Sequence, residues 1–193
     1  MPPCDVFISY RRKTWPFTHR LAEHIRQTTG WEVFVDVTGV DESRFEDSIL
    51  KNLRTCRCFV LVVSPETFDP ARIHQEGDWV RREIREALAT DRKIVLALIE
   101  GLAPPPDGLP EDICEIGSRQ GVKFYADFFE EGVAKLVNFI ATITGLPIAP
   151  PEAPGVNVTI GGNVSGNVTV AGGDVVMTDT DGPDTEKDGG ARK

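Results

Sequence analysis

Short apolar runs alternate with longer amphipathic segments through most of the chain. The run CFVLVVS at residues 58–64 is apolar at almost every position, which is typical of a central parallel strand covered on both faces. Similar runs stand at residues 5–10, 31–36, 93–100 and 122–126. They predict five strands separated by segments that are long enough to hold helices.

Apolar residues in the intervening segments repeat at helical spacing. The first such segment begins near Thr14, an expected N-cap, with Pro16 in its first turn and Gly30 at its end. Further helices are expected over residues 43–55, 78–88 and 129–145. The alternation predicts an α/β fold, a flavodoxin-like doubly wound five-stranded parallel sheet in the order 2-1-3-4-5. Such folds bind ligands at the carboxyl ends of the strands, between strands one and three.

The pattern of the chain changes near its last quarter. The expected parts are an α/β domain at 1–144, a proline-rich linker at 145–155, a Gly/Asn/Val β-prone repeat at 156–178 and a disordered tail at 179–193. Within the repeat, NVTIGGN at 157–163 returns as NVTVAGGD at 167–174. Short β-prone repeats with asparagine and little charge can stack in register, so this segment is a candidate assembly motif.

Composition narrows the classes of function. The chain has 193 residues and a formal net charge of -9, which disfavours general nucleic-acid binding. No basic and apolar leader precedes the first strand, and no apolar run is long enough to cross a bilayer. A cytoplasmic protein without membrane association is therefore expected. Cys56 and Cys58 lack a matching second pair, so no metal site is predicted.

The segment DWVRREIREAL at 78–88 is the most informative helix. Its apolar stripe predicts that one face packs on a core, with Trp79 and Glu83 four residues apart on the face beside it. Taken alone, Glu83 among charged neighbours is typical of a solvated helix face. Taken alone, Trp79 is typical of a partly buried packing residue.

The expected topology gathers other polar residues at the same edge of the sheet. Tyr10, Arg11 and Arg12 follow the first strand, and Asp36 ends the second. Asp36 also suits a capping role. Phe45 lies on the apolar stripe of its helix, so core packing and contact with a ligand both remain open.

Five segments in order resemble one known family. DVFISYRR, VFVD, RFEDSI, CFVLVVSPETF and DWVRREI together are similar to the TIR domain over about residues 4–143, and most similar to its NAD-hydrolysing branch. The resemblance implies that Glu83 is the catalytic glutamate and that Trp79 lines the site. It also implies that Arg11, Arg12 and Phe45 help to hold the dinucleotide.

These residue types suit cleavage of the bond between ribose and nicotinamide. That reaction passes through an oxocarbenium-like state, which a carboxylate beside the ribose can stabilise. Trp79 offers a flat apolar wall, and arginines can pair with a pyrophosphate. NAD+ is then a substrate, and no cofactor is expected. The products would be nicotinamide and ADP-ribose or a cyclic form of it.

Two other functions remain open. Many TIR domains are adaptors that only bind other TIR domains, and an N-glycosidase acting on another nucleotide would use the same carboxylate. TIR enzymes commonly need clustering, so the resemblance implies self-association in an immune or antiphage defence pathway. The repeat at 156–178 could support that assembly or bind an upstream sensor protein.

Overall fold

The computed structural model describes residues 4–35, 42–100, 105–148, 168–171 and 174–177, with the backbone alone for 42–48 and for the last two ranges. The chain forms two compact units, Met1–Pro151 and Glu152–Lys193, and each is described by itself. Asp36, most of the predicted repeat and the predicted tail at 179–193 lie outside the described residues.

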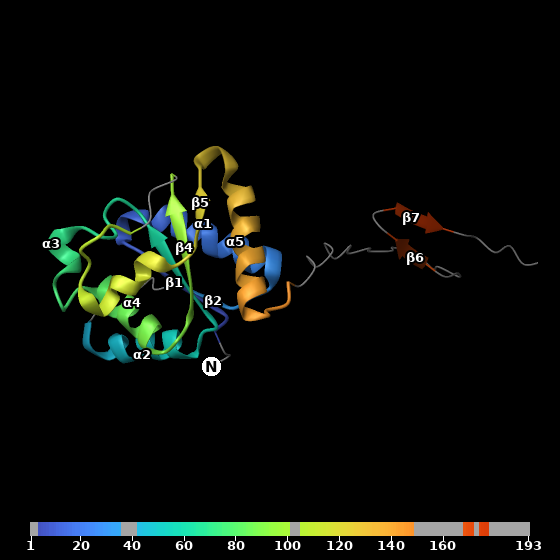
Figure 1. Cartoon of the computed structure of the whole chain (residues 1–193). Helices are drawn as coiled ribbons and strands as arrows, with labels where there is room; N and C mark the ends of the chain where they lie inside the picture. The colour runs from blue at the N-terminus through green and yellow to red at the C-terminus, as the bar shows by residue number, and fades with distance from the viewer. Residues whose placement is uncertain (1–3, 36–41, 101–104, 149–167, 172–173, 178–193) are drawn as a thin grey trace, which may run out of the picture. The chain divides into compact units, whose positions relative to one another are not determined.

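The first unit contains the five-stranded parallel sheet that the sequence predicts (Figure 1). The strands are β1 (Val6–Ser9), β2 (Val33–Val35), β3 (Cys58–Val63), β4 (Lys93–Ile99) and β5 (Gly121–Phe124). Their order is β2-β1-β3-β4-β5, and every neighbouring pair is parallel. The predicted order 2-1-3-4-5 is therefore confirmed.

The helices also follow the predicted segments. They are α1 (Trp15–Thr29), α2 (Glu42–Thr55), α3 (Pro70–Ile73), α4 (Trp79–Ala89) and α5 (Phe129–Thr144), with 3-10 turns η1 (Arg12–Thr14), η2 (Glu111–Ser118) and η3 (Ala126–Phe128). Gly30 ends α1 in the left-handed conformation, as expected. Thr14 is the N-cap of α1, as expected, but its side chain accepts no bond from the helix, and its hydroxyl donates to the Arg11 carbonyl at 2.8 Å.

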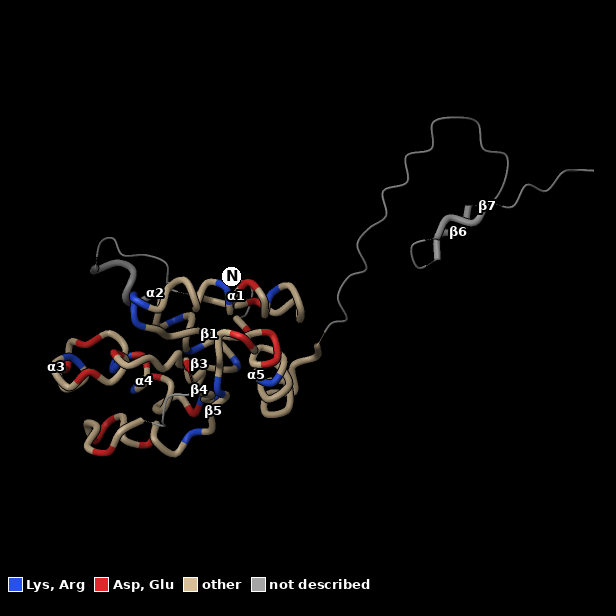
Figure 2. The backbone as a smooth tube through the Cα atoms, turned by 90° about the horizontal axis from the view of Figure 1, so that it is seen from above, with Lys and Arg blue, Asp and Glu red and all other residues tan. Residues whose placement is uncertain are grey.

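The helices cover both faces of the sheet. Alternation along β1 sends Val6 and Ile8 into a core with α1 and α5, and sends Phe7 into a second core with α2 and α4. Figure 2 shows α4 and α5 on opposite sides of the row of strands. The same alternation directs Ser9 toward the face that carries α4.

The first unit continues beyond its last helix. Leu146 is buried, and Trp31 Nε1 donates to the Pro147 carbonyl at 2.6 Å. These contacts hold the first residues of the segment predicted as a linker against the α/β unit. In the described part of the chain, no helix is long and apolar enough to cross a membrane.

The second unit contains one described pair of strands. β6 (Val168–Ala171) and β7 (Asp174–Met177) pair antiparallel, with Val168 opposite Met177 and Ala171 opposite Asp174. Both strands lie inside the segment 156–178 that the sequence predicts to be β-prone.

Candidate active site

The start of α4 lies beside the carboxyl ends of β1 and β3. Asp78 is the N-cap of α4, and its Oδ1 accepts a hydrogen bond from the Arg81 backbone N–H at 3.0 Å. From this cap the helix lays Val80, Ile84 and Ala87 on the core that contains Phe7. The predicted apolar stripe is confirmed, with Leu88 only partly buried at its end.

Glu83 lies within this buried stripe and not on its solvated edge. Its exposed fraction is 2%, so the interpretation of Glu83 as part of a solvated helix face is wrong. Ser9 Oγ donates to Glu83 Oε2 at 2.5 Å, and Ser9 is 1% exposed. A carboxylate can be buried only when polar partners replace its water, and Ser9 is one such partner.

Trp79 lies one helical turn before Glu83. Its ring packs partly against the same core, and the Arg82 guanidinium carbon lies 4.8 Å from the ring centroid. The indole Nε1 is shielded from solvent and has no hydrogen-bond acceptor among the described residues. Trp79 therefore has a packing role, and its buried indole N–H is left without an acceptor among the described residues.

Arg11 and Asp78 form a buried ion pair that holds α4 against the loop after β1. Arg11 Nη1 and Nη2 donate to the two carboxylate oxygens of Asp78 at 2.6 and 3.0 Å. Nε and Nη2 also donate to the Thr67 carbonyl, in the loop after β3, at 3.3 and 2.9 Å. This two-pronged geometry suits arginine and fixes three segments at one point.

The surroundings of Arg11 bear on its predicted contact with substrate. Its side chain is 3% exposed and already donates to Asp78 and Thr67, which favours a role in positioning α4 over direct contact with a phosphate. Arg12, by contrast, is exposed at the start of η1. As substrate-binding residues, both arginines stay predictions.

The remaining predicted residues are less fully placed. Tyr10 is partly buried, and its ring centroid lies 5.9 Å from that of Trp15. Phe45 falls in α2 as predicted, where the structure describes the backbone alone. Asp36 lies outside the described residues, so its role and those of Tyr10 and Phe45 stay predictions.

Sequence reasoning missed two members of this cluster, Ser9 and Asp78. Strand alternation carries the signal for Ser9, because it is the small polar residue that follows Phe7 on the α4 face of a buried strand. An aspartate directly before an amphipathic helix is the signal for Asp78 as an N-cap.

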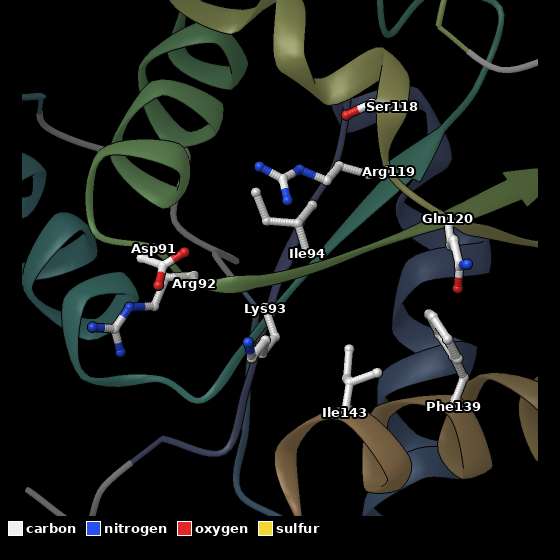
Figure 3. A pocket seen from close by; sticks show the side chains of 9 residues that line it. All are labelled: Asp91, Arg92, Lys93, Ile94, Ser118, Arg119, Gln120, Phe139 and Ile143. Atoms are coloured by element: carbon white, nitrogen blue, oxygen red, sulfur yellow. The ribbon is translucent and has the colours of Figure 1, made fainter.

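A separate cavity opens at the opposite edge of the sheet, near the amino ends of β4 and β5 (Figure 3). Its volume is about 450 Å³. Lys93 and Arg119 give it cationic walls, and Phe139 and Ile143 give it apolar ones. None of the described side chains predicted to form the active site lines it.

Comparison with known families agrees with the observed fold. Residues 6–137 match the TIR domain family. The chain therefore belongs to this family. The TIR domain is 34% identical over 141 residues to the NAD(+) hydrolase tir-1 of Caenorhabditis elegans, a match that covers 70% of this chain and 14% of that protein.

A second relative agrees with this assignment, and a solved structure agrees with the fold. The NAD(+) hydrolase SARM1 of Danio rerio is 34% identical over 137 residues, covering 70% of this chain and 19% of SARM1. The chain thus spans less than a fifth of the length of these two relatives. The TIR domains of the activated Roq1 resistosome superpose with a TM-score of 0.52 at 15% identity, covering 71% of this chain and 99% of that one.

Proposed function

We propose that this TIR protein is an NAD+ glycohydrolase that cleaves the bond between nicotinamide and ribose. One observation carries the proposal: α4 presents a buried carboxylate, Glu83, at the carboxyl edge of the sheet, beside Trp79. In doubly wound sheets this edge is where ligands bind. The relatives named NAD(+) hydrolases lend support over 70% of the chain.

The chemistry requires little beyond a well-placed carboxylate. The C1′–N bond breaks, its electron pair goes to the pyridinium nitrogen, and nicotinamide leaves as a neutral molecule. Positive charge develops on the ribose, and the Glu83 carboxylate stabilises it. Water then attacks C1′ and releases a proton to the solvent, which gives ADP-ribose. Attack by a nucleophile of the substrate itself would give a cyclic product.

In this proposal the residues around Glu83 bind the NAD+ substrate. Trp79 forms a flat wall that excludes water from the reacting bond in this proposal. Arg12, exposed beside the same edge, pairs with the pyrophosphate. Tyr10, Asp36 and Phe45 complete the substrate site in this proposal.

Assembly is the proposed means of activation. The TIR unit associates with other copies, and the segment 156–178, which contains the β6–β7 pair, adds a second contact with copies or with an upstream sensor. The relation to TIR domains in a resistosome supports an assembled state. A defence pathway in the cytoplasm is the proposed setting.

Nicotinamide release from NAD+ by purified full-length protein tests the proposal, under dilute and under crowded conditions. Wild-type protein should release nicotinamide, and Glu83→Ala should not. Glu76→Ala is the matched control, because Glu76 is an exposed glutamate shortly before α4 and should be dispensable. A truncation after residue 150 tests the contribution of the tail.

The same assay separates the alternatives. Folded wild-type protein that releases no nicotinamide under any condition would contradict the proposal and favour an adaptor. Faster cleavage of simple nucleotides than of NAD+ would instead identify an N-glycosidase with another substrate.

A further inference from the structure

We propose that Ser9 is a positioning residue that orients the Glu83 carboxylate for glycosidic cleavage. This inference rests on the proposed function, because it assigns Ser9 a task in that reaction. The observation behind it is the bond from Ser9 Oγ to Glu83 Oε2, 2.5 Å long and buried at both ends.

The backbone of Ser9 is held in the sheet by its pairing with β3. β1 lies between β2 and β3 in the sheet, and Ser9 itself is in register with Leu61 of β3. Its hydroxyl therefore projects from the interior of the sheet and not from a loop. Groups on such rigid elements hold a functional side chain more accurately than groups on loops do.

The hydrogen bond from Ser9 is made to the carboxylate of Glu83, the group that would stabilise the transition state. A donor fixed to Oε2 restrains rotation of the carboxylate about its last bond, and so sets the direction of Oε1. It also replaces water that the carboxylate loses on burial. Both effects keep the carboxylate in one orientation before substrate arrives, which is the condition for electrostatic stabilisation of a transition state.

A second contact from the end of β1 fixes the position of helix α4. Arg11, two residues after Ser9, holds Asp78, the N-cap of α4, through two hydrogen bonds. Ser9 then reaches Glu83 five residues further along the helix. The end of β1 thus fixes α4 at its cap and fixes the carboxylate separately, so the two contacts have different tasks.

Kinetics of Ser9→Ala and Ser9→Thr in the full-length protein test the inference. We expect Ser9→Ala to lower kcat for nicotinamide release about 10- to 100-fold, with KM changed less than about threefold, because a hydrogen bond to a charged group that acts in the reaction is lost. Ser9→Thr keeps the hydroxyl on a residue suited to a strand, and should retain kcat within about threefold.

Thr29→Ala is the matched control. Thr29 is also buried, and its hydroxyl donates to the Ile25 carbonyl at 2.6 Å on the opposite face of the sheet. This variant should lose stability but keep kcat per folded molecule. If Ser9→Ala keeps wild-type kcat, or loses activity only in proportion to its loss of folded protein, the inference is wrong.

An unfolding cycle tests the contact without any activity. Ser9→Ala should shift the denaturant midpoint less in a Glu83→Ala background than in wild-type protein, because the acceptor is already gone. Equal shifts in the two backgrounds would overturn the inference, even if Ser9→Thr fails to fold. If wild-type protein releases no nicotinamide, the proposed function fails, while this cycle still decides whether Ser9 and Glu83 interact.

Discussion

Helices α4 and α5 pack on opposite faces of one sheet, yet they bury different kinds of side chain. The buried residues of α5 are all apolar or glycine: Phe129, Gly132, Val133, Leu136, Val137 and Ile140. The buried stripe of α4 has Val80, Ile84 and Ala87 around a carboxylate, Glu83. The two helices have the same structural task, and only α4 interrupts its packing surface with a group that could react.

That difference extends to the surroundings of each helix. The buried charged side chains among the described residues are Arg11, Asp78 and Glu83, and all three belong to α4 or contact it. Buried charges cost free energy and need paired or hydrogen-bonded partners. The polar cluster beside α4 therefore costs some folding free energy, whereas the buried residues of α5 stabilise the fold through apolar packing.

The largest expected effect follows from removing the charge of Glu83 and keeping its shape. Glu83→Gln retains an amide oxygen that can accept from Ser9, but it cannot stabilise a developing positive charge. Nicotinamide release should fall at least about 1000-fold, or roughly 4 kcal/mol in activation free energy. The melting temperature should stay within a few degrees of wild type. A Gln variant that keeps its activity would place the chemistry elsewhere.

Breaking the buried ion pair should have the next largest effect. Asp78→Asn leaves the Arg11 guanidinium buried without its counter-charge, so the free energy of unfolding should fall by about 3–5 kcal/mol. Urea unfolding measures this change, with the exposed Asp107→Asn as control. The double variant Arg11→Met/Asp78→Leu should recover part of the loss, and no recovery would contradict the ion-pair explanation.

A smaller effect is expected on the α5 face. A Cβ at Gly132 would lie 2.7 Å from Phe124 Cδ1, and that ring is buried in the core. Gly132→Ala should therefore destabilise the protein by about 1–3 kcal/mol, although alanine normally favours a helix. Thermal unfolding checks the loss, and kcat per folded molecule should be unchanged. A stabilised variant would show that Phe124 moves aside.

A last comparison concerns the buried thiols of the two cores: Cys4 and Cys56 lie in the core on the α4 side, and Cys58 lies in the core on the α5 side. Burial raises the pKa of Cys4 to about 11 and of Cys56 to about 12, from 9.0 when unfolded, and both lie in the α4-side core. The unfolded chain then loses these protons first. The contribution of these two buried thiols to the free energy of unfolding should be fully present below pH 9. It should be lost progressively as the pH rises toward 11.

Denaturant midpoints between pH 8 and pH 10.5 measure this decline, and Cys4→Ala should make it shallower. The exposed Cys114 should be the thiol that reacts first with an alkylating reagent at pH 8. Rapid labelling of Cys4 or Cys56 in native protein would contradict their burial.

The fold was largely predictable from local pattern. Apolar runs gave five strands, amphipathic spacing gave the long helices, and alternation of the two gave the parallel order. Trp79 and Glu83 were expected to share a helix face, because residues four apart on a helix must do so. These predictions depend on backbone periodicity, which a single sequence displays directly.

The contacts of the site were not predictable in the same way. Ser9 and Glu83 are 74 residues apart in the chain, and Arg11 and Asp78 are 67 apart. Periodicity placed Glu83 beside the buried stripe, but the helix lies over the end of β1 closely enough to bury it. The extent to which Glu83 is buried depends on how α4 packs against β1. Helical spacing carries no information about that packing.

The bond from Trp31 to Pro147 gives this protein a built-in optical reporter. The chain has three tryptophans, Trp15, Trp31 and Trp79, and the indole of Trp31 is buried with its N–H held by residue 147. Replacing Trp15 and Trp79 by phenylalanine would leave one fluorophore. Release of the segment after α5 would expose that indole to water and shift its emission to longer wavelength. Detachment of the C-terminal connection could then be followed in real time, with no substrate and no added dye.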